Sequence, residues 1–276
     1  MIIPMEWEGE GPVSLVGEER KQQIIELLAA KGKVTSTELV QLFDVSKESV
    51  RRYLDELESE GKLRKVYGGA VKLVGHKEPP HLERIMLYRE EKHRIGQYAA
   101  ALVQDGEVLF LDEGTTALAV IEHLNQCSLT VLTNSIPAAT LLIDRLNQGQ
   151  FDGRVVMLGG EINAKHARCS DSVTESLLER YYVDKAFISV DGLQAEAGLT
   201  CLDDGKAAVS RKAIEHAAET IVVSDSSKLG LRHPYRISPL QRNWHIVCDQ
   251  APPADWIAML EQSGITWLTA GHPDPE

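Results

Sequence analysis

Short apolar runs recur through the larger, C-terminal part of the chain, and each is followed by polar or glycine residues and then by a helical pattern. The runs lie at residues 108–111, 129–132, 155–158, 186–190, 220–223 and 245–248, and helices are predicted over 81–104, 117–124 and 136–147. Runs of this length between turn residues are typical of buried strands. Strands that alternate with helices predict an α/β fold with a mostly parallel sheet, covered on both faces.

Three amphipathic helices are predicted in the N-terminal part. The first covers residues 20–30, the second opens at Thr35 and carries the apolar residues of 39–43, and the third opens at Ser46 and stops before Glu60-Gly61. Thr35 begins a capping box that Glu38 completes by reaching back three residues. Ser46 is placed to cap the third helix, whose apolar residues recur at positions 50, 54 and 57 on one face.

A basic hairpin is predicted after the third helix. Residues 62–73 alternate between polar and apolar positions around Gly68-Gly69, which reads as the two-residue turn. Helix, capped helix, tight turn, capped helix and hairpin, in that order, form a winged helix-turn-helix. In that layout the helix over 46–54 enters a DNA groove and the hairpin rests on phosphates. The alternative for that helix is an ordinary charged, solvated surface.

The charge distribution favours DNA binding by the N-terminal part only. The 276 residues carry a formal net charge of −12, with a pI of about 5.3, which argues against a protein that coats DNA along its whole surface. Residues 46–75 hold seven Lys/Arg against five Asp/Glu, whereas residues 76–276 hold 18 against 28. We expect a disordered tail at 1–17, a winged helix-turn-helix domain at 18–75, and an α/β domain at 76–276 that begins with a linker helix.

The cysteines and the apolar runs bear on location and cofactors. Four cysteines at 127, 169, 201 and 248 form no closely spaced pair, and His166 with Cys169 offers too few ligands for a metal. We therefore expect no metal, no cofactor and a reducing cytoplasm. No apolar run approaches the ~18 residues of a membrane span, and the first 17 residues do not read as a signal peptide.

Polar and glycine residues follow the predicted strands, where open α/β sheets bind their ligands. Gly114, Thr115 and Thr116 would present backbone N–H groups and two hydroxyls to a phosphate, and Lys228 would add a positive charge. The alternative for one such loop is a helix cap and a glycine turn without a ligand. Several such loops along one edge of the sheet favour a binding site.

Both parts of the sequence resemble one protein family. The run VSKESVRRYL at 45–54 and YGGA at 67–70 resemble the N-terminal domain of the DeoR/GlpR family of bacterial transcription regulators, and the similarity covers residues 19–71. The motifs DEGTT (112–116), LTVLTNS (129–135), MLGG (157–160), FISVDG (187–192), GLT (198–200) and SDSSK (224–228) resemble the ligand-sensing domain of that family. The resemblance implies an α/β sensor domain similar in fold to ribose-5-phosphate isomerase, which senses phosphorylated sugars or related metabolites.

Candidate site residues follow from the patterns and from the resemblance. The expected DNA contacts are Thr35, Ser36, Ser46, Lys47, Ser49, Arg51, Arg52, Arg64, Lys65 and Tyr67, although Arg51 or Arg52 could instead brace its helix against Asp55 or Glu56. The expected effector contacts are Asp112, Gly114, Thr115, Thr116, Asn134, Ser135, Gly160, Asp191, Gly192, Lys206 and Lys228.

The chain departs from the family pattern at three places. Tyr53 stands where members commonly carry Asp, Gly205-Lys206 replaces an acidic pair, and a Gly-Pro-like step near residues 169–171 is missing. Lys206 could add a cation to the effector site, which suits a more anionic effector, or it could mark a changed or lost ligand.

Three functions remain open from the sequence. The first, which we favour, is a cytoplasmic repressor of a carbohydrate operon, a non-enzyme that binds operator DNA as a dimer or tetramer under control of a phosphorylated sugar. The second is a sugar-phosphate isomerase fused to a DNA-binding domain, with Asp112, Glu113 or Asp191 as the base. The third is a DNA-binding protein that no longer senses a ligand. The predicted helix over 81–104 is the candidate for dimerisation.

Overall fold

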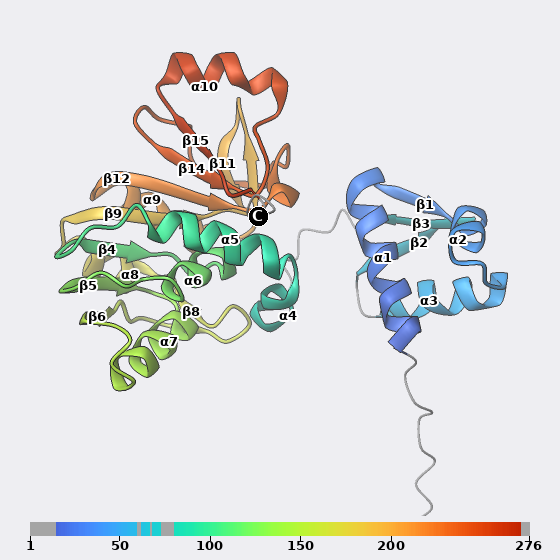
Figure 1. Cartoon of the computed structure of the whole chain (residues 1–276), viewed down its shortest axis with the longest axis horizontal. Helices are drawn as coiled ribbons and strands as arrows, with labels where there is room; N and C mark the ends of the chain where they lie inside the picture. The colour runs from blue at the N-terminus through green and yellow to red at the C-terminus, as the bar shows by residue number, and fades with distance from the viewer. Residues whose placement is uncertain (1–14, 60–61, 67, 73–79, 272–276) are drawn as a thin grey trace, which may run out of the picture. The chain divides into compact units, whose positions relative to one another are not determined.

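The chain divides into two compact units, residues 1–75 and 76–276. The structure is a computed structural model, and it describes residues 15–59, 62–66, 68–72 and 80–271 (Figure 1). None of the helices in these ranges is long and apolar enough to cross a membrane.

The first unit combines three helices with a small antiparallel sheet. The elements are α1 (Leu15–Lys31), β1 (Lys33–Thr35), α2 (Ser36–Phe43), α3 (Lys47–Ser59), β2 (Leu63–Val66) and β3 (Gly69–Lys72), and the strand order is β1-β3-β2. Val50, Leu54 and Leu57 are buried on one face of α3, as their spacing predicts. This is the predicted winged helix-turn-helix, except that α1 begins at Leu15, inside the segment expected to be a tail.

Hydrogen bonds from side chains fix where α2 and α3 begin. The Ser49 N–H donates to Ser46 Oγ at 3.1 Å, and the Glu38 N–H donates to Thr35 Oγ1 at 3.1 Å. Both expected caps are therefore confirmed. The Glu38 carboxylate instead pairs with the Lys31 ammonium, so only the Thr35 half of the expected capping box is present among the described residues.

The turn of the hairpin lies one residue earlier than predicted. Val66 pairs with Gly69, so residues 67–68 connect the strands, and Gly68 has a φ of 82°. Gly69 is the first residue of β3 and also pairs with Thr35. A Cβ at Gly69 would lie 2.1 Å from the carbonyl oxygen of Val34, so the close approach of β1 to β3 requires glycine there.

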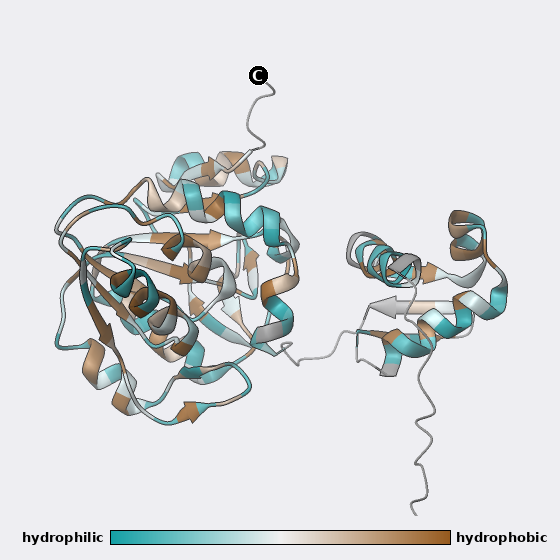
Figure 2. Cartoon of the chain, turned by 60° about the horizontal axis from the view of Figure 1, so that its bottom comes forward, coloured by the Kyte–Doolittle hydropathy of each residue, from teal (hydrophilic) through white to brown (hydrophobic). Residues whose placement is uncertain are grey.

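The second unit is built on a sheet of seven parallel strands. In order across the sheet they are β15 (Thr266–Thr269), β14 (His245–Cys248), β12 (Ala217–Ser224), β9 (Val183–Ser189), β4 (Val108–Leu111), β5 (Leu129–Thr133) and β6 (Gly153–Met157). All six predicted strands are present, and Figure 2 shows that the strands of the sheet are mainly hydrophobic. The edge strand β15 was not predicted, because threonines at both of its ends leave only two consecutive apolar residues, Trp267 and Leu268.

Helices and a second small sheet cover the two faces of the parallel sheet. One face packs on α5 (Arg89–Ala100), α6 (Thr115–Ile121) and α7 (Ile136–Asn147), which contribute to one apolar cluster. The other packs on α8 (Ser172–Leu178), α9 (Asp204–Glu215), α10 (Ile257–Ser263) and the antiparallel sheet of β10 (Gly192–Gln194), β11 (Gly198–Cys201) and β13 (Tyr235–Ser238). The pair β7 (Ile162–Asn163) and β8 (Arg168–Cys169) lies outside these sheets.

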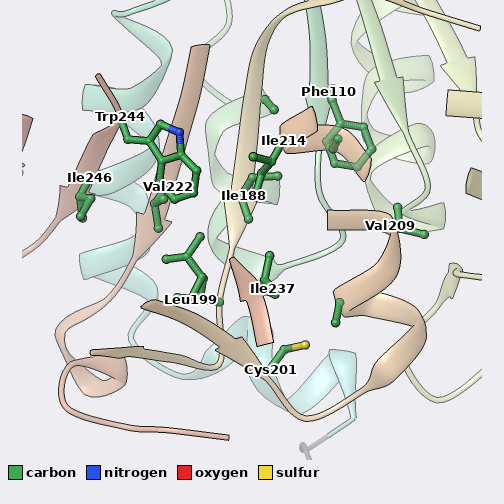
Figure 3. Packing of buried hydrophobic residues seen from close by; sticks show 14 of the residues in the cluster. Phe110, Ile188, Leu199, Cys201, Val209, Ile214, Val222, Ile237, Trp244 and Ile246 are labelled. Carbon is green, nitrogen blue, oxygen red and sulfur yellow. The ribbon is translucent and has the colours of Figure 1, made fainter. Parts of the chain in front are cut away.

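Alternation along the strands divides the core in two. Leu109 and Leu111 belong to the cluster beneath α5 and α6, whereas Phe110 between them belongs to the other. Figure 3 shows Phe110 in that second cluster, with Ile188 and Val222 from neighbouring strands. Each central strand is therefore buried on both faces, as its continuous apolar sequence indicates.

The helix predicted over residues 81–104 is wrong as a single element. It is broken into α4 (His81–Met86) and α5, because Leu87 is extended and Tyr88 has a φ of 55°. The ammonium of Lys92 donates 2.6 Å hydrogen bonds to the carbonyls of Arg84 and Leu87, at the end of α4, where a helix cannot satisfy its last carbonyls by itself. A side chain that folds back in this way leaves no glycine or proline signal in the sequence.

The buried face of α3 gives a test of the first unit. Replacing Leu57, which has 0% exposure, by alanine should destabilise the unit by about 2–5 kcal/mol, since a cavity remains. Leu42, which is 56% exposed on α2, is the matched control, and Leu42→Ala should cost no more than about 0.5 kcal/mol. Amide hydrogen exchange of peptides from residues 15–72 in the full chain measures both, and equal protection of the two variants would contradict the packing.

Candidate functional site

One side of α3 is exposed within its unit. Lys47 and Glu48 are exposed, and the side chains of Arg51 and Arg52 are 68% and 67% exposed. Ser46 is exposed at the cap, and the opposite side holds the buried leucines of the core. The exposed side leaves a convex, arginine-bearing surface of the kind that enters a groove.

Both arginines lie near carboxylates of their own helix. Arg51 is 3.8 Å from Asp55 and 4.0 Å from Glu48, and Arg52 is 3.8 Å from Glu56. Exposed pairs of this length contribute little, about 0–1 kcal/mol, so a phosphate or a base edge can replace them. Arg51 and Arg52 can therefore pair with carboxylates of their own helix in the free protein and still be available to contact DNA.

The hairpin is tied to α3 through Lys65. Its backbone N–H donates to Glu58 Oε1 at 2.8 Å, and its ammonium pairs with Asp55. The side chain of Arg64 and the whole of Tyr67 lie outside the described residues. Thr35 is exposed, and the half-buried Ser36 donates its backbone N–H to Gly68 at 2.8 Å.

Tyr53, the departure from the family pattern on α3, is a core residue. It is 5% exposed, and its hydroxyl accepts a 3.4 Å hydrogen bond from Arg20 of α1. The guanidinium of Arg52 lies 5.6 Å from the centre of its ring. Tyr53 is therefore part of the core of the unit and helps to place Arg52 and α1.

In the second unit, a pocket lies at the carboxyl ends of β4, β9 and β12. This sensor pocket is lined by Arg84, Leu87, Tyr88, Lys92, Gly114, Thr115, Thr116, Ser189, Val190, Asp191, Asp225 and Lys228. It therefore gathers five of the eleven expected effector residues, which are Gly114, Thr115, Thr116, Asp191 and Lys228. Its position agrees with the rule for open α/β sheets.

Two cations of the sensor pocket were missed by sequence reasoning. Arg84 comes from α4 and Lys92 from α5, and both were assigned to a dimerisation helix. A signal existed for Lys92, because it lies three, four and seven residues before Ile95, Gly96 and Ala99, on the buried face of α5. A lysine on an apolar face needs a polar partner.

The charges around the sensor pocket have identifiable causes. Burial lowers the pKa of Lys92 to about 8, although the charge of Asp225 acts in the opposite direction. The carboxylates of the rim are used to hold loops, since Asp191 accepts from the Leu202 N–H at 3.0 Å and Asp225 from the Ser227 N–H at 3.1 Å. The positive charges of Lys92 and Lys228 are thus balanced by the two carboxylates. An anion in the pocket would be held by individual hydrogen-bond donors and not by an excess of positive charge.

Gly114 is required by the close approach of two strand ends. A Cβ there would lie 2.2 Å from Ser189 Oγ, so only glycine lets the turn after β4 pass over the end of β9. Thr115 and Thr116, the next two residues, also line the pocket.

Asp112 lies beneath the sensor pocket and is saturated with donors. Its Oδ2 accepts from the Ser189 N–H at 3.1 Å, from Ser189 Oγ at 2.9 Å, and from Lys206 and Ser210 at 3.3 Å. The residue is 1% exposed. Asp112 therefore joins the end of β4 to β9 and α9, and it does not line the pocket.

Glu113 is buried among three cations. Its carboxylate lies 2.6 Å from Arg168, 3.1 Å from Lys206 and 3.4 Å from Arg84. Burial alone would raise the pKa of Glu113, but the charges of Lys206, Arg168 and Arg84 outweigh it and hold the pKa well below its usual range. Arg168 also pairs with Asp203 at 2.7 Å.

The expectation that Lys206 adds a free cation to the effector site is corrected by this network. Lys206 is 1% exposed, and its ammonium contacts Asp112, Glu113 and Ser189. Its ammonium pairs with two buried carboxylates. The replacement of an acidic pair by Gly205-Lys206 therefore changes the buried charged residues beneath the pocket and not its lining.

The remaining expected effector residues hold loops together. Asn134 donates to the Cys169 carbonyl at 2.8 Å, and Ser135 caps α7 by accepting from the Ala138 N–H at 3.3 Å. Gly160 has a φ of 145°, and a Cβ at Gly192 would lie 2.5 Å from the Leu231 carbonyl oxygen. None of these four residues is among those that line the sensor pocket.

The comparisons with known proteins match both units. Residues 20–73 match the family model described as the DeoR-like helix-turn-helix domain, and residues 88–250 match the DeoR C terminal sensor domain. The chain is 32% identical over 253 residues to the HTH-type transcriptional repressor GlcR of Bacillus subtilis, covering 91% of this chain and 95% of that protein. It is 34% identical over 215 residues to the lactose phosphotransferase system repressor of Streptococcus mutans, covering 77% and 84%.

Solved structures with a likeness to the chain include the ribose 5-phosphate isomerase A of Methanocaldococcus jannaschii, with a TM-score of 0.37 and 22% identity over 51% of this chain and 55% of that one. The eIF2B delta subunit of Chaetomium thermophilum has a TM-score of 0.39 and 13% identity, over 81% and 92%. The two family models together span a helix-turn-helix unit and a sensor unit in the order found here. The chain belongs to the DeoR family of DNA-binding transcriptional regulators.

Proposed function

We propose that the protein is a repressor of a carbohydrate operon whose affinity for its operator is controlled by a small phosphorylated sugar in the sensor pocket. The observation that carries the proposal is that Thr115 and Thr116 line one pocket together with Lys92 and Lys228, at the carboxyl ends of three adjacent strands. Two relatives with high coverage are named as repressors, one of them for a lactose phosphotransferase system.

The sensor pocket is small, and this bears on how a ligand would act. Its free volume is about 40 Å³, room for only a few water molecules. A sugar phosphate therefore requires the segment that carries Arg84, Leu87 and Tyr88 to move. That segment joins α4 to α5 near the start of the unit, so its displacement is our proposed signal to the DNA-binding unit, with a coupling of about 1–3 kcal/mol.

Operator binding is proposed to use the exposed side of α3, with Lys47, Arg51 and Arg52 at the groove and the hairpin on phosphates. A single winged helix-turn-helix makes few contacts, so we propose that the protein acts in the cytoplasm as a homo-oligomer on symmetric half-sites. The geometry does not favour the isomerase alternative. Asp112 and Glu113 are buried and paired with cations, and the carboxylate of Asp191, which lines the pocket, accepts the Leu202 N–H.

The first test concerns DNA. Arg52→Ala should weaken binding to an operator selected from a random DNA library by about 5–150-fold, as expected for an arginine worth ~1–3 kcal/mol. Arg236→Ala, which alters an exposed arginine of the sensor unit, is the matched control and should leave the affinity unchanged. Fluorescence anisotropy measures both, and an unaltered affinity of Arg52→Ala would remove this residue from the interface.

The second test concerns the effector. A thermal-shift screen of sugar phosphates should find a ligand that raises the melting temperature, since a ligand that binds the folded state stabilises it. Lys228→Gln should weaken that ligand by about tenfold or more, because a hydrogen bond to a charged group contributes ~1.5–3 kcal/mol. Arg154→Gln, an exposed site on β6, should not. No stabilising ligand in the screen would favour a regulator that does not sense sugar phosphates.

The third test uses the titration of Lys92. With a pKa of about 8, Lys92 loses its positive charge as the pH rises from 7 to 9, while a phosphate monoester, with a second pKa of about 6, stays doubly charged. Affinity for the effector should therefore fall over this range, by at most about tenfold, since about one-tenth of the lysine stays protonated one unit above its pKa.

The matched variants for that test differ only at the charged group. Lys92→Met should show weaker binding with little dependence on pH between 7 and 9. Lys92→Arg keeps its charge throughout and should bind equally at both ends of the range. Isothermal titration calorimetry gives the affinities. A wild-type profile that does not change between pH 7 and 9, together with unaltered binding by Lys92→Met, would exclude Lys92 from ligand contact.

A further inference from the structure

A cluster of two histidines and one carboxylate lies away from the strand ends, between two helices. His93 comes from α5, and Glu122 and His123 directly follow the last residue of α6. Each residue offers a ligand atom, and these atoms lie within 4.8 Å of one another. His93 Nδ1 is 3.6 Å from Glu122 Oε2. The centres of the two imidazole rings are 4.5 Å apart, and the rings meet edge to face.

The close crossing of α5 and α6 brings these residues together. A Cβ at Gly96 would lie 2.5 Å from the carbonyl oxygen of Ala119, so the two backbones touch at that point. His93 is one turn before Gly96, and Glu122 is one turn after Ala119, so both project from the same crossing. Figure 1 shows the two helices side by side on one face of the sheet. The cluster is therefore fixed by rigid elements.

One ring nitrogen of the cluster has no hydrogen-bond partner. His123 Nε2 is buried, and it has no donor or acceptor among the atoms that the structure describes. Buried polar atoms are nearly always paired, so such an atom needs an explanation. A ring nitrogen of a neutral imidazole that makes no hydrogen bond has a lone pair to offer a metal.

We propose that His93, Glu122 and His123 form a binding site for a divalent transition metal of the Zn²⁺ class. Two imidazoles and one carboxylate, with the remaining positions open to solvent or a small ligand, form a donor set typical of such ions. Tetrahedral ligands 2.0–2.1 Å from a metal are about 3.3 Å apart. The side chains of His93 and Glu122 are 52% and 53% exposed, so both are free to turn toward His123.

The site is separate from the sensor pocket but shares its helices. α5 carries Lys92 next to His93, and α6 begins with Thr115 and ends at the cluster. A hollow lined by residues of α4, α5 and α6, including Arg89, His93 and Glu122, gives access from solvent. A bound ion would bridge the two helices at their close crossing.

The experiment is a titration of the full-length, metal-free protein with Zn²⁺ and Co²⁺. We expect calorimetry to give one bound metal ion per chain. Co²⁺ should give visible absorption bands of the high intensity that four-coordinate sites show. His93→Gln and His123→Gln should each weaken binding by at least the ~10–100-fold that loss of an outer-shell partner costs. His216→Gln, a half-buried histidine at the end of α9, is the matched control and should bind as the wild type does.

Three results would overturn the site. The first is that the wild-type protein binds no metal. The second is that His93→Gln and His123→Gln bind the metal as tightly as the wild type does, and the third is that His216→Gln loses as much metal affinity as they do. The unfolding temperature of each variant without metal is measured alongside. A variant whose unfolding temperature falls is replaced by Glu122→Gln, whose exposed side chain leaves the fold intact and whose unchanged affinity would also overturn the site.

Discussion

The structure of the sensor unit depends on a buried carboxylate, Glu113, surrounded by three cations from distant parts of the chain. Arg84 comes from α4, Arg168 from β8 and Lys206 from α9, and all three meet at the end of β4. Breaking a buried pair by removing one partner typically costs about 3–5 kcal/mol, because the other charge is left uncompensated. The loops that form the sensor pocket are therefore positioned by electrostatics, while the sheet beneath them is positioned by apolar packing.

This division bears on the proposed movement of the segment between α4 and α5. The ends of β4 and β9 are joined through Asp112 and Ser189, which are buried and fully bonded. The junction of α4 and α5 is held by two hydrogen bonds from Lys92 and by an ion pair of Arg84 at 3.4 Å. A ligand that competes for these donors would release the junction without disturbing the strand ends, which is what a sensor requires.

The sequence predicted the features that depend on local patterns. The Ser46 cap, the buried face of α3 and the strand at His245–Cys248 follow from short-range hydrogen bonds and from periodic burial, so each can be read within about ten residues. The break between α4 and α5 and the partners of Lys206 could not be read in this way. They arise from charged side chains that meet only in the folded chain, and a residue's type does not reveal whether its charge faces a ligand or another residue.

The position of Lys206 has a consequence for how relatives of this protein can diverge. A change at Lys206 would remove the cation that is paired with the buried Asp112, while Glu113 would keep its pairs with Arg84 and Arg168, so a compensating change near Asp112 is favoured. Lys228 is half-buried at the rim of the pocket, and no ion pair joins it to a buried carboxylate among the described residues. On the proposed function, ligand preference can therefore change by single substitutions at the rim. A substitution in the layer below favours a second one beside it, and two lineages with different lower layers could still recognise the same metabolite.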